Sequence, residues 1–302
     1  MPERLKFLPV APGFAAIGFT ALRRVAQATA MALAAAFMAA PAAGTTPIDR
    51  IATVPAERGP ALWVVQDADT TIFLFGTFHA LDRQSNWFNQ SVRAAFDASD
   101  QLVLETLVPE DPAELHATIA RHTAAMEPRA GEPVYVDRNA STFVGSAGEA
   151  MSAGREMGMS VDHGADAVLR RAANANGKPV AGLESFEFQL RMFGTLPPPP
   201  PPRALKRPGA ATVTALLGDM QSAWKRGDNE GFAVMLGNVR AQSPQAYKTL
   251  FTDRNATWAG WIADRMSRPG TVFVAVGTGH LVGPDSVQRY LAARGIPSAR
   301  IS

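Results

Sequence analysis

The chain of 302 residues contains no cysteine. This absence excludes disulfide bonds, zinc sites with cysteine ligands, a cysteine nucleophile and a lipoprotein anchor attached to cysteine. Motifs for a nucleophile elbow, a phosphate-binding loop and a dinucleotide-binding loop are also absent. The folded state must therefore depend on a hydrophobic core, for which a hydrophobic content of 47% is sufficient.

An excess of one charge is also absent from most of the chain. The formal net charge is +2, but residues 1–42 contain four basic residues and only one acidic residue. Without this segment, basic and acidic residues nearly balance. The sequence therefore offers no basic surface of the kind that binds nucleic acid.

Residues 1–42 have the features of a secretory signal peptide. Arg23 and Arg24 precede an apolar run over residues 25–39, and Ala40-Pro41-Ala42 matches a small-x-small cleavage site. We expect a periplasmic or secreted protein that contacts the membrane transiently, through this segment only. An uncleaved N-terminal membrane anchor is the alternative.

The rest of the chain predicts a linker at residues 43–60 and one α/β domain at residues 61–302. β-Branched and aromatic runs favour strands, and amphipathic spacing between them favours helices. The expected strands are 61–65, 71–75, 101–105, 178–183 and 271–276, and the expected helices include 91–99, 166–176 and about 284–294. We expect a mixed central sheet with flanking helices, interrupted by helical insertions at about 110–160 and 203–266, the second lying between the two halves of the sheet. Six prolines at residues 197–202 predict a stiff polyproline II spacer.

Two matching motifs lie near the ends of this domain. One strand-forming run leads into Gly76-Thr-Phe-His79, and another leads into Gly277-Thr-Gly-His280. Open α/β sheets bind ligands just beyond the carboxyl ends of their strands. A core can explain one histidine in such a place, whereas two in the same local pattern indicate a shared site.

Two carboxylates have the same predicted location. Glu105 ends the apolar run at residues 102–104, and Glu184 follows the predicted strand that ends at Leu183. Two imidazoles with one or two carboxylates can bind zinc, manganese, cobalt or iron, and a metal-bound water is a nucleophile near neutral pH. The structural alternatives are a histidine satisfied within the core and a glutamate that caps the helix beginning at Ser185.

Arg254 is a further candidate, within the segment Asp253-Arg-Asn-Ala-Thr-Trp258. A functional arginine here binds a carboxylate or stabilises a developing oxyanion, whereas a structural one pairs with a nearby acidic residue. The other three histidines, His116, His122 and His163, do not follow strands, and we interpret them as surface residues.

Taken together, these motifs resemble the TraB/GumN family, also called TraB/PrgY, and its GumN-like branch most closely. The matching segments, in chain order, are 75–79, 102–105, 164–166, 177–184, 188–190, 254–258 and 276–283. The resemblance implies an α/β fold in which two Gly-x-x-His motifs and a glutamate build a metal centre, as in the related Tiki metalloproteases, where that centre cleaves peptides. By motif, His79, Glu105 and His280 would be the metal ligands, with Arg254 nearby.

The leading interpretation is a metal-dependent hydrolase, peptidase-like, that uses Mn, Co or Zn and acts on a peptide or small molecule. Glu105 or Glu184 would be the general base, and Arg254 would stabilise the oxyanion. The alternative is a non-catalytic module that binds a peptide signal or haem. A third interpretation, an accessory protein of envelope or exopolysaccharide assembly, depends on the GumN association alone.

Overall fold

The computed structural model describes residues 59–125, 153–196 and 210–302. The predicted signal peptide, nearly all of the predicted linker, most of the first helical insertion and the proline run lie outside these ranges. No helix within the ranges is long and apolar enough to cross a membrane.

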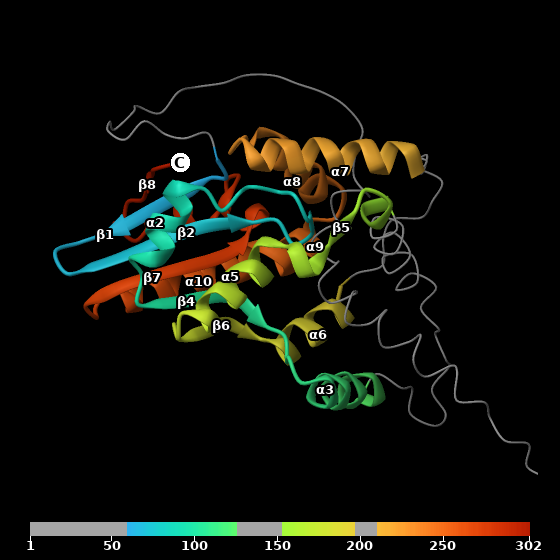
Figure 1. Cartoon of the computed structure of the whole chain (residues 1–302), viewed down its shortest axis with the longest axis horizontal. Coiled ribbons are helices and arrows are strands. Elements are labelled where there is room, and N and C mark those ends of the chain that lie inside the picture. The colour runs from blue at the N-terminus through green and yellow to red at the C-terminus, as the bar shows by residue number, and fades with distance from the viewer. Residues whose placement is uncertain (1–58, 126–152, 197–209) are drawn as a thin grey trace, which may run out of the picture.

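The centre of the domain is a six-stranded sheet in the order β6-β4-β7-β2-β1-β8 (Figure 1). Its strands are β1 (Leu62–Gln66), β2 (Thr70–Thr77), β4 (Gln101–Leu107), β6 (Val180–Ser185), β7 (Gly270–Gly277) and β8 (Ala299–Arg300). Strands β6, β4, β7 and β2 are parallel, whereas β1 pairs antiparallel with both β2 and β8. The predicted mixed sheet is therefore confirmed, and β8 is an edge strand that the sequence patterns did not predict.

Helices cover both faces of the sheet. One face packs against α2 (Gln90–Asp97), α5 (Ala165–Ala175), α7 (Ala210–Lys225) and α8 (Glu230–Gln242), and the other against α10 (Asp253–Arg265) and α11 (Val287–Ala292). Figure 1 shows α2 and α5 in front of the strands and α10 behind them. The strands alternate accordingly, because Phe273 and Ala275 face the first cluster while Val272 and Val274 face the second.

The remaining elements are short or peripheral. They are the two-stranded sheet of β3 (Leu81–Asp82) and β5 (Met159–Ser160), helices α3 (Pro112–Ala125), α6 (Phe186–Gly194) and α9 (Pro244–Tyr247), the π-helical turn η3 (Lys248–Thr252), and the 3-10 turns η1 (Val161–His163) and η4 (Thr278–Leu281). The predicted helices at 91–99 and 166–176 agree with α2 and α5 to within two residues, while the one at 284–294 is shorter, as α11.

The order of the strands creates a crevice at one edge of the sheet. After β4 the chain passes outward to its neighbour β6, whereas after β7 it continues to β8 at the opposite edge. The chain thus leaves two adjacent parallel strands in opposite directions, which opens a space beyond their carboxyl ends. Glu105 lies near the end of β4 and His280 just after β7, so both reach this space.

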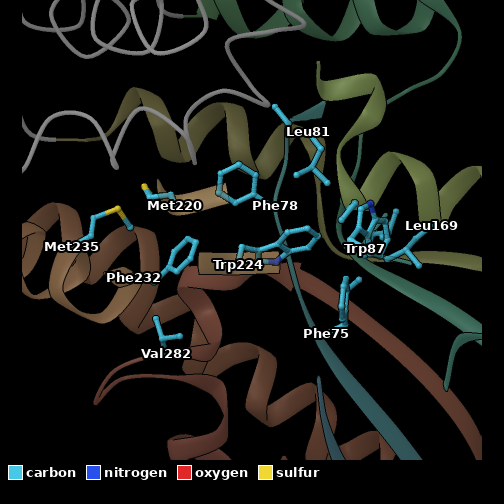
Figure 2. Close-up of a cluster of buried hydrophobic side chains, with 14 of the residues drawn as sticks. Phe75, Phe78, Leu81, Trp87, Leu169, Met220, Trp224, Phe232, Met235 and Val282 are labelled. Carbon is cyan, nitrogen blue, oxygen red and sulfur yellow. The ribbon is translucent and has the colours of Figure 1, made fainter. Parts of the chain in front are cut away.

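Trp224 of α7 connects this helix to the end of β2, just before His79. Its indole Nε1 donates a 2.8 Å hydrogen bond to the carbonyl oxygen of Gly76, and the ring is 1% exposed. Figure 2 shows Trp224 between Phe75, Phe78 and Trp87, with ring centroids 5.6–6.3 Å from that of Trp224. The contact holds the end of β2 against the helical layer.

We predict that Trp224→Phe lowers the free energy of unfolding by about 1–3 kcal/mol, because the buried Gly76 carbonyl loses its donor. Urea denaturation measures this change. Phe188→Leu is the control, since Phe188 is 41% exposed and its replacement should change stability by less than about 0.5 kcal/mol. Equal stability of Trp224→Phe and the wild type would contradict the role assigned to this bond.

Candidate functional site

A cavity of about 240 Å³ lies at the carboxyl ends of β2, β4 and β7. Its lining includes four of the five residues singled out from the sequence: His79, Glu105, Arg254 and His280. Glu184 does not line the cavity, although it lies within hydrogen-bonding distance of Arg254. His116, His122 and His163 are also outside the cavity; His116 is exposed, whereas His122 and His163 are half-buried.

Both cavity histidines have one ring nitrogen held by an acceptor. His79 Nδ1 lies 3.0 Å from Asp166 Oδ1, and His280 Nδ1 lies 2.6 Å from Asn255 Oδ1. The Asn255 amide is itself oriented, because its Nδ2 donates to the carbonyl of Asp285 at 2.7 Å. In a neutral ring, an acceptor on Nδ1 favours a proton there and leaves the lone pair on Nε2, which is the usual arrangement around metal-binding histidines.

The Nε2 atoms of His79 and His280 both lie near the Glu105 carboxylate. His280 Nε2 is 3.8 Å from Glu105 Oε2. A Cβ atom added to Gly277 would lie 2.9 Å from His79 Nε2 and 3.4 Å from Glu105 Oε2, so only glycine leaves these groups room. The Gly277 N–H donates to Glu105 Oε2 at 3.1 Å. The second Gly-Thr-x-His motif thus positions both its own histidine and the carboxylate.

The threonine of the second motif joins the start of η4 to the end of β2. Thr278 Oγ1 donates to the carbonyl of Thr77 at 3.0 Å, and both residues are buried. A side chain on Gly76 would lie 2.9 Å from Thr278 Oγ1. The two motifs therefore pack directly against each other, as the parallel pairing of β2 with β7 requires.

Arg254 connects the acidic groups. Its Nη2 donates to Glu105 Oε1 at 2.6 Å, while its Nε and Nη2 bind the two oxygens of Glu184, each at 2.8 Å. Nη1 donates to the carbonyl of Leu250 at 3.1 Å and lies 3.3 Å from His280 Nε2. Arg254 is only 6% exposed, so these partners compensate a charge that is almost removed from water.

The surroundings separate the pKa values of the two histidines. Burial alone would lower the pKa of His79, but the Asp166 carboxylate outweighs burial and raises this pKa to about 9. Burial and the adjacent Arg254 charge lower the pKa of His280 to about 3. At neutral pH, His280 is a neutral imidazole, the protonation state that binds metals.

The pKa values of the two glutamates also shift in opposite directions. Burial would raise the pKa of Glu105, yet Arg254 and the two histidines hold it well below the usual range. Burial raises the pKa of Glu184 despite its contact with Arg254. Glu105 is therefore the more firmly ionised carboxylate, and it is also the one that reaches the cavity.

The donor chemistry of this site suits a divalent cation, but its spacing does so only in part. Two donors about 2.0–2.2 Å from one zinc ion can be up to about 4 Å apart, which includes the separation of His280 and Glu105. Within the three described ranges, however, no group of three histidine or acidic residues is spaced to hold a metal ion. The geometry thus provides a donor pair and a second oriented imidazole rather than a complete ligand set.

Sequence reasoning overlooked three residues that contact the candidate side chains. Asp166 was expected only as the first residue of the helix at 166–176, but it binds His79 from the first turn of α5, whose N-cap is Gly164. Asn255 orients His280, and Gln189 Nε2 donates to Glu105 Oε1 at 3.0 Å. The only sequence signal for them was their place within the motifs at 164–166, 188–190 and 254–258.

Comparison with known proteins gives one family and two partial relatives. The family model described as TraB/PrgY/gumN matches residues 61–143 and 116–300. The chain is 31% identical over 140 residues to "Uncharacterized protein YbaP" of Escherichia coli (strain K12) and to the protein of that name from Shigella flexneri. Each alignment covers 45% of this chain, which spans about half (51%) of the relative's length. No solved structure matches, and these matches do not test the proposed GumN-like branch or the relation to Tiki proteins.

We predict that Arg254→Met lowers the free energy of unfolding by about 3–5 kcal/mol, because it leaves two carboxylates buried without their cation. Adding Glu184→Gln should recover about 0.5–3 kcal/mol of this loss, since one buried charge is then removed. Urea denaturation of the two single variants and the double variant measures the coupling. Strictly additive effects would show that the Arg254–Glu184 pair is energetically unimportant.

We predict that His79 titrates near pH 9 in protein kept in a chelator, and that Asp166→Asn lowers this pKa because the attracting carboxylate is lost. A pKa raised by folding stabilises the protein fully below pH 6.5, and this stabilisation is lost as the pH rises through 9. Asp166→Asn should therefore cost more stability at pH 6 than at pH 10. NMR titration and denaturation at both pH values test this, with the buried His280 resonance as internal control. A wild-type His79 that titrates below pH 6.5 would contradict the assignment.

Proposed function

This chain belongs to the TraB/PrgY/gumN family, and we propose that its strand-end cavity is the site of a metal-dependent hydrolase that acts on peptide-like substrates. The observation that carries the proposal is the arrangement of His79 and His280. Each has Nδ1 held by an acceptor, Glu105 Oε2 lies 3.8 Å from His280 Nε2, and a Cβ atom on Gly277 would lie within 3.4 Å of both Glu105 Oε2 and His79 Nε2. Structural histidines need no such matched orientation toward one carboxylate.

We propose that His79, Glu105 and His280 hold the metal, which we take to be Mn, Co or Zn, and that metal binding draws these three side chains closer together than their present spacing. A bound divalent cation supplies a polarised carbonyl and a water of lowered pKa. The neutral state of His280 and the ionised state of Glu105 are the ones that metal binding requires.

The remaining polar residues are assigned from their contacts. Arg254 places a fixed positive charge in the cavity lining, with its Nη1 3.3 Å from His280 Nε2, where it can stabilise a developing oxyanion. Glu184 has the pKa better suited to a general base, but it is bound by Arg254 and does not line the cavity. We therefore assign Glu184 to positioning Arg254 and Asn255 to positioning His280.

A ligand-binding module without turnover is the second candidate function. Apolar side chains such as Phe78, Phe232 and Met235 line much of the cavity and suit ligand capture. The volume of about 240 Å³ is below the roughly 300–1,000 Å³ of typical ligand sites, which favours a short peptide segment over haem.

Export to the periplasm or medium stays a prediction from residues 1–42.

We predict that the wild type binds Mn²⁺ or Zn²⁺ at one site and that His79→Ala and His280→Ala each weaken this affinity by more than the about 10–100-fold typical of losing an outer partner. Isothermal titration of chelator-treated, dialysed protein measures the affinity, and a peptide hydrolysis assay measures turnover. His116→Ala is the matched control, because His116 is exposed on α3, away from the cavity. Unchanged affinity in both cavity variants would reject the metal site, and bound metal without cleavage of any peptide would favour the binding module.

A further inference from the structure

Two chemically different sides of the cavity adjoin the candidate metal ligands, and charged residues of η1 and α5, namely Asp162, Asp166, Arg170 and Arg171, also line it. The polar side comes from the ends of the strands and from α10, with Glu105, His280 and Arg254. Every lining residue from α7, α8 and η3 is apolar, and these residues are Leu217, Met220, Phe232, Met235, Leu250 and Phe251. We refer to these six residues as the apolar wall.

The apolar wall directly adjoins the candidate metal ligands. The Phe251 ring centroid is 5.1 Å from that of His280, and a Cβ atom on Gly279 would be 3.0 Å from the Phe251 ring. A group packed against the wall therefore lies next to the bond that the polar side would act on.

The wall can also adapt its shape. Met220 and Met235 are flexible, polarizable side chains that fill irregular spaces. Figure 2 shows Met220 beside Phe78 and Met235 near Phe232, and Phe78 and Phe232 pack edge to face at 6.3 Å. A charged side chain placed here would lose its hydration without gaining a partner from the wall, whereas an apolar one gains contacts.

We propose that the apolar wall is a specificity pocket that accepts one apolar side chain, such as leucine or phenylalanine, from the residue beside the amide presented to His79, Glu105 and His280. This inference rests on the proposed hydrolase function and names its substrate class. The cavity volume of about 240 Å³ is below that of typical ligand sites, so it suits one side chain and its neighbouring amide rather than a longer segment.

The test measures binding separately from metal and turnover. Acetylated, amidated tripeptides Ala-X-Ala, with X as Leu, Phe, Lys or Asp, are titrated into the full chain by NMR, first in chelator and then with Mn²⁺. We expect the Leu and Phe peptides to bind at least about 10-fold more tightly than the Lys and Asp peptides. Met235→Ala should shift the preference from Leu toward Phe because it enlarges the pocket, whereas Met235→Leu should retain the wild-type order.

Val234→Ala is the matched control, since Val234 precedes Met235 on α8, is 55% exposed and does not line the cavity. Equal affinity for the Leu and Lys peptides, no binding of any peptide, or an unchanged preference in folded Met235→Ala protein would each overturn the proposal. If the protein binds no metal but still prefers the apolar peptides in chelator, the hydrolase function would be rejected and the peptide-binding pocket would be retained.

Discussion

The geometry of the site depends on the ion pairs and hydrogen bonds that Arg254 makes. One guanidinium binds carboxylates at the ends of β4 and β6 and lies against the histidine that follows β7. Three strand ends are thereby held at fixed separations by one side chain from α10, which packs on the opposite face from α7 and α8. A buried charge of this kind is tolerated only when its partners are well placed, so the site and the packing of α10 depend on each other. Trp258 supports the same arrangement, because the Arg254 guanidinium lies 4.7 Å from its ring and the His280 ring 4.4 Å away.

Two nearly identical motifs become chemically unequal in this environment. The histidine after β2 faces the carboxylate Asp166, while the one after β7 faces the neutral amide of Asn255 and the cation Arg254. Their pKa values consequently move in opposite directions, to about 9 and about 3. Without a metal, this separation gives one site both a protonated and a neutral imidazole near neutral pH, so a metal held by both histidines would have to displace the His79 proton. The apolar wall adds a region of different chemistry within the same small cavity. The proposed pocket for an apolar side chain therefore lies beside the polar side.

Much of the fold was predictable because its signals are local. β-Branched runs identified β2, β4 and β7, and amphipathic spacing identified α2 and α5 to within two residues. The insertion of β7 between β4 and β2 was not predictable, because strand order depends on long-range pairing that leaves no local pattern. The edge strand β8 has only two residues, too few for a periodic signal. The segments expected at 1–58, most of 110–160 and 197–202 lie outside the part of the chain that the structure describes, so those predictions stand untested.

For the candidate site, the sequence by itself determined which residues lie near or just after the carboxyl ends of the parallel strands: His79, Glu105, Glu184 and His280. Strand propensity and the Gly-Thr-x-His pattern act over a few residues and can be recognised without a fold. Only the tertiary structure decided which of these residues face the cavity, because Glu184 on β6 binds Arg254 without lining the cavity, while Glu105 on β4 lines it and lies near both Arg254 and His280. The tertiary structure also brings Asp166 to His79 and Asn255 to His280 from helices in other parts of the chain. Hydrogen bonding and pKa depend on distances between such segments, and folding alone establishes those distances.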